Sequence, residues 1–288
     1  PDPVLQQMEN FSDPTFGAND AFKPVSRYWD RITHPAQIIQ SLPNALATLL
    51  DPADCGPAFI GLHQDVQGWA YDYPKTFFLK KTHRIRRQIP DPEEIKDAIS
   101  LLECAKRPLI IAGGGIQYSR ATAELDAFVE KHQIPVVETI AGRANMRHNH
   151  PLNCGPIGVT GSNSANALAE HADVILSVGT RLQDFTTGSW TAFSHDAKFI
   201  SVNAARFDAA KHRSLPIVGD AKVSLNALTD ALSYQAAHSW INFAKDERAK
   251  WDAYVTDNTS HGHNKPNSYA QAIGVVNTYC DKRDRIVA

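Results

Sequence analysis

The sequence lacks any apolar run long enough to cross a membrane. Its longest apolar stretches, such as residues 109–112 and 174–178, fall far short of the roughly 20 residues that a membrane-spanning helix needs. An excess of charge of one sign is also missing, because 29 Lys and Arg residues stand against 31 Asp and Glu residues. The resulting net charge of −2 gives no field that would attract nucleic acid or an anionic membrane, so we expect neither as a partner.

Cysteine is scarce, and its spacing excludes the usual cysteine sites. The four cysteines, Cys55, Cys104, Cys154 and Cys280, lie far apart and none belongs to a C-x-x-C pair. We therefore expect reduced thiols, with neither a zinc site nor a redox dithiol. The G-x-S-x-G and H-E-x-x-H motifs are also missing, so no local pattern indicates a serine hydrolase or a zinc protease.

Two H-x-H pairs, His148 with His150 and His261 with His263, have a spacing that could bind a metal ion from a strand. Both pairs lie among polar loop residues, and neither has a third ligand at a suitable spacing. Surface histidines are the favoured interpretation, and we expect no metal site.

The 288 residues are enough for two domains, and 43% hydrophobic residues are enough for a sizeable core. The middle of the chain alternates short apolar runs with stretches of helical spacing. The sequence Asp91-Pro92-Glu93-Glu94 is typical of a helix start, with Asp91 as the cap and Glu94 placed to bond back to it. The predicted strands are residues 108–112, 135–137, 174–178, 198–202 and 216–218. Apolar strands separated by helices predict an α/β fold, a doubly wound parallel sheet of Rossmann type over residues 91–238.

The flanks of this region do not look like complete domains. Upstream, the pattern predicts a helix over residues 39–49 and a strand over 58–62. Residues 79–90 are predicted to be a linker, and their basic run over 80–87 is either a solvated connector or a contact for a phosphate-bearing partner. Downstream, helices are predicted within 240–254 and 267–288. The chain opens on Pro1 without Met and closes on residues 285–288, which resemble a cut strand, so we interpret it as an internal fragment.

Three glycine-containing turns follow predicted strands. Gly113, Gly114 and Gly115 lie between a strand and a helix, but Tyr118 stands where a dinucleotide fingerprint has its third glycine. A second turn contains Gly158 and Gly161 and leads into a helix capped by Ser162 or Asn163. A third begins at Gly179. Because the carboxyl ends of parallel strands meet at one edge, these turns either cradle an anion together or are simply tight turns.

Near these turns, the single residue Glu138 and the pair of Arg181 with Asp184 each allow two interpretations. Glu138, near the end of a strand, is either a ribose ligand or an exposed carboxylate. Arg181 with Asp184 is either a phosphate ligand held by a carboxylate or a structural ion pair.

The order of these segments resembles the thiamine-diphosphate-dependent enzymes of the acetolactate synthase type. The resemblance rests on residues 91–115, on 158–184 with Gly179-Thr180-Arg181, and on Gly219-Asp220-Ala221. It implies a central doubly wound domain over 91–238, the later part of a pyrimidine-binding domain over 1–78, and the opening of a pyrophosphate-binding domain over 239–288.

Residues 20–32 and 180–190 are most similar to one branch of this family, which hydrolyses a ring C–C bond of a cyclic diketone to 5-deoxyglucuronate in myo-inositol breakdown. The resemblance implies a cytoplasmic homo-oligomer, a dimer or tetramer. The alternatives are an enzyme of the acetolactate synthase or sulfoacetaldehyde acetyltransferase type, and a noncatalytic nucleotide-binding or assembly module.

The resemblance also implies thiamine diphosphate and Mg²⁺ as cofactors of the whole enzyme. The family's activating glutamate and its Gly-Asp-Gly…Asn element are missing, since Gly219-Asp220-Ala221 has alanine in place of glycine, so we expect this chain alone to bind neither cofactor tightly. Phe22, Lys23 and Arg27 are the candidates for residues near the substrate, with an interdomain ion pair as the alternative for the two cations. The turns correspond to the family's flavin contacts and are interpreted as a vestigial nucleotide site, made of Gly113, Gly114, Gly115, Gly158, Gly161, Gly179 and Arg181.

Overall fold

The computed structural model describes residues 12–13, 16–260, 266–281 and 283–284. It divides the chain into two compact units, Pro1–Gln88 and Ile89–Ala288, which are treated one at a time below. The predictions for His261 and His263 and for a strand at 285–288 lie outside the described residues. Within these residues, no helix combines the length and the apolar character that a bilayer crossing requires.

The smaller unit is built on two parallel strands, β1 (Tyr28–Ile32) and β2 (Ala58–Leu62), with Tyr28 opposite Ala58 and Ile32 opposite Leu62. Helix α1 (Ile38–Leu50) packs on both strands, and short helical turns complete the unit: η1 (Ala18–Val25), η2 (Pro35–Gln37), α2 (Gln64–Gln67) and η3 (Lys75–Phe78). The predictions of β2 and α1 are confirmed.

Strand β1 was not predicted, because Asp30 and Arg31 interrupt its apolar pattern. The structure satisfies Asp30 locally, since its carboxylate accepts hydrogen bonds from the Ser41 hydroxyl and from the Tyr28 hydroxyl. These bonds, led by the one from Ser41, lower the pKa of Asp30.

The larger unit contains a six-stranded sheet in the order β5-β4-β3-β6-β7-β8, and all paired strands are parallel. The strands are β3 (Pro108–Ala112), β4 (Val136–Glu138), β5 (Asn153–Pro156), β6 (Val174–Val178), β7 (Lys198–Asn203) and β8 (Leu215–Val218). This confirms the α/β class with a parallel sheet. Only β5 was not predicted, since Asn, Gly and Pro are uncommon within strands.

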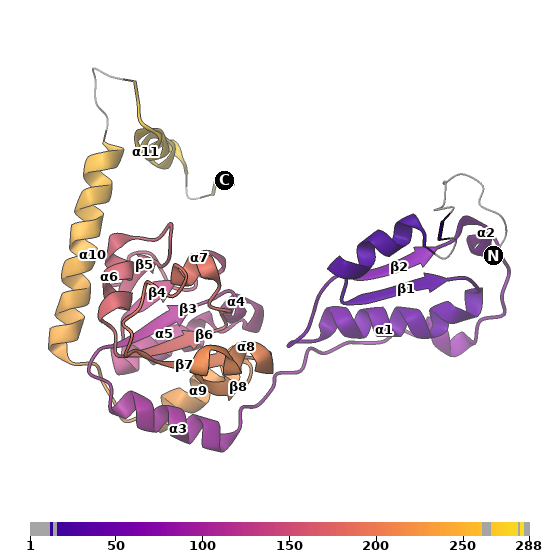
Figure 1. Cartoon of the computed structure of the whole chain (residues 1–288), viewed down its shortest axis with the longest axis horizontal. Helices are drawn as coiled ribbons and strands as arrows, with labels where there is room; N and C mark the ends of the chain where they lie inside the picture. Colours follow the sequence, from indigo (N-terminus) through magenta and orange to yellow (C-terminus); the bar gives the residue numbers. More distant parts are fainter. Residues whose placement is uncertain (1–11, 14–15, 261–265, 282, 285–288) are drawn as a thin grey trace. The chain divides into compact units, whose positions relative to one another are not determined.

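Helices cover both faces of this sheet. Their bounds are α3 (Pro92–Glu103), α4 (Gly115–Ser119), α5 (Thr122–His132), α6 (Asn163–His171), α7 (Asp184–Thr187), α8 (Arg206–Ala210), α9 (Ala221–Ala231), α10 (His238–Thr259) and α11 (Tyr269–Tyr279), with the turns η4 (Ile140–Gly142) and η5 (Lys211–Arg213). Helix α9 contacts α3, α4 and α5, whereas α6 packs against α10 (Figure 1). Within the sheet, β4 and β5 lie on one side of β3, and β6, β7 and β8 lie on its other side. The crossover through α5 to β4 and the crossover through α6 to β6 therefore run in opposite directions across the sheet. Because both are right-handed, α5 and α6 lie on opposite faces.

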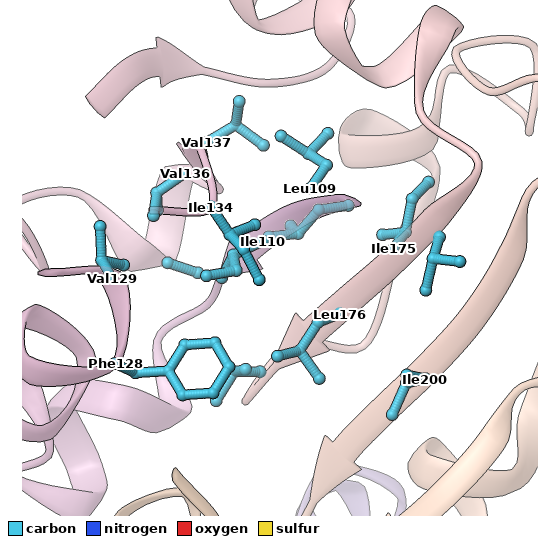
Figure 2. Packing of buried hydrophobic residues seen from close by; sticks show 14 of the residues in the cluster. Leu109, Ile110, Phe128, Val129, Ile134, Val136, Val137, Ile175, Leu176 and Ile200 are labelled. Carbon is cyan, nitrogen blue, oxygen red and sulfur yellow. The ribbon is translucent and has the colours of Figure 1, made fainter. Parts of the chain in front are cut away.

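The core of the larger unit lies on both sides of the two central strands. Every residue of β3 and β6 is buried, and Figure 2 shows Ile110 and Leu176 on the side of Phe128 of α5, with Leu109 and Ile175 on the other side of the strands. Burying one such side chain contributes about 1.5–3 kcal/mol. This is why the sheet holds the turns at its carboxyl edge in fixed positions.

The predicted start of α3 is partly wrong. Asp91 caps the helix by accepting a bond from the Glu93 amide at 2.9 Å, as expected. Glu94, however, does not bond back to the cap, because its Oε2 accepts the amide of Val218 at 2.7 Å. Val218 ends the edge strand β8, and the carboxylate supplies the partner that its amide requires.

Candidate functional site

The first and third glycine turns follow β3 and β6, the neighbouring strands between which the strand order changes direction. Open parallel sheets gather ligands at this point, outside the carboxyl ends of the strands. Here the turn amides already have protein partners. The Gly113 amide donates to the Val178 carbonyl at 2.8 Å, the Gly115 amide to the Gly179 carbonyl at 2.9 Å, and the Gly179 amide to the Val202 carbonyl at 2.8 Å.

The same turns pack backbone against backbone. A Cβ atom at Gly113 would lie 2.3 Å from the Gly179 carbonyl oxygen, and one at Gly115 would lie 2.6 Å from the Gly179 Cα. Gly179 also has a φ of +62°, which L residues with side chains rarely adopt. Close packing of the two turns therefore explains these glycines without a bound pyrophosphate, and their contact with a nucleotide or flavin stays a prediction.

The second turn is held by the first residues of α6. The side-chain amide of Asn166 accepts the Gly158 amide and donates to the Gly158 carbonyl, each at 3.0 Å. Gly158 has a φ of +115°, and a Cβ there would lie 2.0 Å from the Phe185 carbonyl oxygen. The helix cap is Ser162, whose Oγ accepts the Ala165 amide at 3.1 Å. Of the two predicted caps, Ser162 is the one that the structure uses.

The interpretation of Glu138 as an exposed carboxylate is wrong. Its side chain is buried, and its Oε1 accepts the Met146 amide at 2.9 Å, which anchors the loop after β4. In that loop the Asn145 amide nitrogen donates to the Gly113 carbonyl at 2.8 Å, while its Oδ1 is buried without a partner. Asn145 thus contacts the first glycine turn and keeps an unused hydrogen-bond acceptor.

The predicted pairing of Arg181 with Asp184 is also wrong. The Arg181 guanidinium lies 3.5 Å from the Asp208 carboxylate of α8, whereas Asp184 accepts a bond from the Ser189 hydroxyl at 2.9 Å. The parallel register of β6 and β7 brings the residues that follow these strands together, so Asp208 is near in space although far along the chain. Arg181 remains largely exposed and stays a candidate phosphate ligand.

In the smaller unit, Phe22, Lys23 and Arg27 occupy the segment just before and at the start of β1. Phe22 stacks on Phe59 at 4.7 Å, and the Lys23 ammonium lies 4.2 Å from the centre of the Trp29 ring. Lys23 pairs with Asp20 at 2.5 Å and Arg27 with Asp54 at 3.2 Å, both within the same unit.

Asp20 organises this segment, and the sequence pattern did not single it out. Its buried carboxylate pairs with Lys23 and with Arg31, each at 2.5 Å, and accepts the Gly17 amide at 2.8 Å. The bonds from Lys23 and Gly17, together with the charge of Arg31, hold the pKa of Asp20 far below its usual range. Two cations share one carboxylate, so the segment keeps a net positive charge.

No group of three or more His, Cys, Asp or Glu side chains that could hold a metal ion occurs among the described residues. His150 is not a surface histidine as predicted. It is buried, its Nδ1 accepts the Leu152 amide at 3.2 Å, and its Nε2 lies 3.0 Å from the Glu130 carboxylate. Asp220 serves as the cap of α9, accepting the amides of Lys222 and Val223. Because its carboxylate already caps α9, Asp220 does not fit a magnesium diphosphate site.

One comparison with known proteins concerns most of the larger unit. Residues 95–228 match the family described as "Thiamine pyrophosphate enzyme, central domain". The matched range includes strands β3 to β8 and all three glycine turns.

The chain is also similar to proteins named 3D-(3,5/4)-trihydroxycyclohexane-1,2-dione hydrolase. The relative from Geobacillus thermodenitrificans is 44% identical over 88% of this chain, and one from Clostridium perfringens is 46% identical over 83%. One from Bacillus anthracis is 38% identical over 100% of this chain. The chain spans 39%, 38% and 49% of the length of these three relatives, respectively.

Proposed function

Residues 95–228 are the central domain of a thiamine pyrophosphate enzyme, and on this premise we propose that the chain is part of a hydrolase acting on trihydroxycyclohexane-1,2-dione. One observation carries the proposal: the similarity to the named hydrolases extends through both units and not only through the central domain. The reaction is the hydrolysis of a ring C–C bond, which gives 5-deoxyglucuronate in inositol breakdown.

The cofactors of this hydrolase would be thiamine diphosphate and Mg²⁺, which the family implies for the whole enzyme. Among the described residues, no carboxylate cluster fits the metal, and Asp220 is already used as a helix cap. We therefore assign cofactor binding to regions that the relatives contain beyond the length matched by this chain. The 288-residue chain alone is expected to be inactive.

The carboxyl edge of the sheet supports a role within a longer protein. Each of the strands β3 to β7 is followed by one large, exposed apolar side chain, and the exposed fractions run from 63% to 90% for Tyr118, Ile140, Val159, Phe185 and Phe207. Several large apolar side chains exposed after the ends of neighbouring strands favour an interface that another part of the protein covers. We propose that further domains or a second subunit of the dimeric or tetrameric enzyme cover this edge.

We propose that Phe22, Lys23 and Arg27 lie near the substrate in the whole enzyme. Lys23 and Arg27 each keep about half of their side-chain surface exposed, 53% and 52%, although both are paired. The Arg27–Asp54 pair is exposed on both sides and contributes little to stability, so Arg27 can contact an oxygen-rich or enolate-like species at small cost to the fold. Lys23 can reach such a species through the exposed half of its side chain. Phe22, stacked on Phe59, fixes the position of the segment.

The test is an assay of the whole protein with trihydroxycyclohexane-1,2-dione and, in parallel, with pyruvate and sulfoacetaldehyde. Turnover of the cyclic dione alone is the expected result. Turnover of pyruvate or sulfoacetaldehyde instead would replace the proposal with the corresponding branch of the family. Calorimetric titration of the 288-residue chain with thiamine diphosphate and Mg²⁺ is expected to show no tight binding.

The roles of Lys23 and Arg27 are tested in the same assay. Removing a charge-assisted hydrogen bond costs about 1.5–3 kcal/mol, so Lys23→Ala and Arg27→Ala should each lower kcat/KM about tenfold or more. Lys75→Ala, which removes an exposed cation of the same unit, is the matched control and should leave kcat/KM unchanged. Equal activity of all three variants would remove Lys23 and Arg27 from the substrate site.

A further inference from the structure

A cavity of about 420 Å³ lies in the larger unit beside the start of β7 and β8. The residues that matter here are Trp190, Phe193, Lys198, Phe199, His212 and Arg213, and we call it the Trp190 cavity. Its volume falls within the range of about 300–1,000 Å³ that is common for small-molecule sites. It lies at the amino ends of these strands, at the edge of the sheet opposite the glycine turns.

One wall of the Trp190 cavity is a set of packed aromatic rings. Phe193 and Phe199 are buried and meet edge to face, with ring centres 5.1 Å apart. Trp190 lies 5.7 Å from Phe193 and 5.3 Å from Phe199, and is only half-buried. The Trp190 ring also contacts His212 at a tilt of 46°, with ring centres 4.2 Å apart. The two buried rings thus hold a half-exposed indole and an imidazole on which a flat ring can stack.

The cavity is also lined by two adjacent cations. Ile200 of β7 is in register with Leu215 of β8, and Lys198 and Arg213 each lie two positions before these residues. Both cations line the same cavity, Lys198 from the first position of β7 and Arg213 from the turn η5. Neither forms an ion pair with a carboxylate of the described residues, whereas the nearby Lys211 pairs with Asp208 at 2.9 Å. Two adjacent unpaired positive charges complement a dianion.

The backbone around the Trp190 cavity adopts conformations that residues with side chains avoid. Ser189 and Trp190 have φ values of +53° and +67°, and His212 and Arg213 have values of +60° and +58°. Such residues persist only where their surroundings hold them, and they occur most often at functional sites. Here the Ser189 hydroxyl donates to Asp184 at 2.9 Å and fixes the turn that carries Trp190. Burial and the charge of Lys211 lower the pKa of His212.

From the cavity, its aromatic wall and its unpaired cations, we propose that the Trp190 cavity binds a small phosphorylated compound with a flat ring. The ring stacks on Trp190 and His212, and the phosphate lies between Lys198 and Arg213. A phosphate is favoured over a carboxylate because its second charge at neutral pH balances the second cation. The residues that line this cavity belong to the larger unit, whereas Phe22, Lys23 and Arg27 belong to the smaller one.

Isothermal titration of the 288-residue chain with adenosine 5′-monophosphate tests this proposal. Adenosine provides the ring without the phosphate, and ribose 5-phosphate provides the phosphate without the flat ring. We expect measurable binding of the monophosphate, and binding at least about tenfold weaker for each of the two partial compounds. The variant Lys198→Gln/Arg213→Gln should weaken binding of the monophosphate at least tenfold. Both side chains are exposed, so this variant is expected to fold normally.

The matched control is Arg206→Gln/Lys245→Gln, which removes one arginine and one lysine that are likewise exposed and do not line the cavity. It should bind like the unaltered chain. The proposal is overturned if millimolar monophosphate gives no binding, if adenosine binds equally well, or if both double variants bind alike. Equal binding by both variants would place the ligand elsewhere. None of these outcomes depends on the hydrolase assay, so the two proposals stand or fall separately.

Discussion

The close packing of the glycine turns can be tested by adding one methyl group at Gly179. In Gly179→Ala the new Cβ would lie 2.7 Å from the Gly115 Cα, and the residue would keep a φ of +62°. A left-handed conformation costs a residue with a side chain about 1–2 kcal/mol. The methyl group meets backbone atoms, which can move only if β3 and β6 shift, and such overpacking costs about 1–3 kcal/mol more. The expected loss in free energy of unfolding is about 2–5 kcal/mol.

Gly188→Ala separates the two contributions. Gly188 also has a left-handed φ, +54°, but a Cβ there would meet only the Thr191 hydroxyl at 3.3 Å. This variant should lose only the conformational part, about 1–2 kcal/mol. Urea unfolding of the larger unit, followed by far-UV circular dichroism, measures both losses. Equal losses in the two variants would refute the argument that the turns are glycine-rich because they pack against each other.

Three further predictions follow from single groups. Glu94→Ala should cost about 1–3 kcal/mol, because it leaves the Val218 amide without its acceptor, and hydrogen exchange at that amide should accelerate. The pKa of Asp20 is lowered in the folded state, so the stability that its carboxylate contributes is present above about pH 4 and is lost as the pH falls. Below that pH, the thermal midpoint of Asp20→Asn should therefore vary less with pH than that of the unaltered chain. Burial raises the pKa of the Cys154 thiol to about 12, so it should react with a thiol reagent at pH 8 only after unfolding.

Each of these predictions has a control within the chain. Glu93→Ala removes an exposed carboxylate from the same helix turn and should cost less than about 0.5 kcal/mol. Asp54→Asn removes the exposed partner of Arg27, and its thermal midpoint should follow pH as that of the unaltered chain does. Cys55 is exposed and should react in the folded chain. A rapidly reacting Cys154 would contradict the burial of this side chain in β5.

The sequence predicted those elements whose residues agree with the local pattern. Strands β3 and β6 are apolar throughout, and the predicted ranges 108–112 and 174–178 match the structure. Strand β1 contains two charged residues whose partners come from other elements, and β5 contains residues that usually break strands. Local composition could not reveal either strand, since their pairing depends on neighbours that are distant along the chain.

The candidate site shows the same limit. The positions of Gly113 and Gly179 were predictable, because glycine marks a turn after a strand. Their mutual contact was not, because it depends on the strand order. Arg181 was assigned to a carboxylate three residues away, yet it meets Asp208, which the neighbouring strand brings close. The partners of charged side chains follow the topology more than the spacing along the sequence.

The segment between the two units has a practical consequence. Residues 79–91 have no regular secondary structure, and Lys80, Lys81, Arg84, Arg86 and Arg87 are all exposed within it. Trypsin cleaves after lysine and arginine in exposed, irregular chain, so brief digestion should cut here first. The two products would allow each half of the molecule to be purified and its melting recorded without interference from the other.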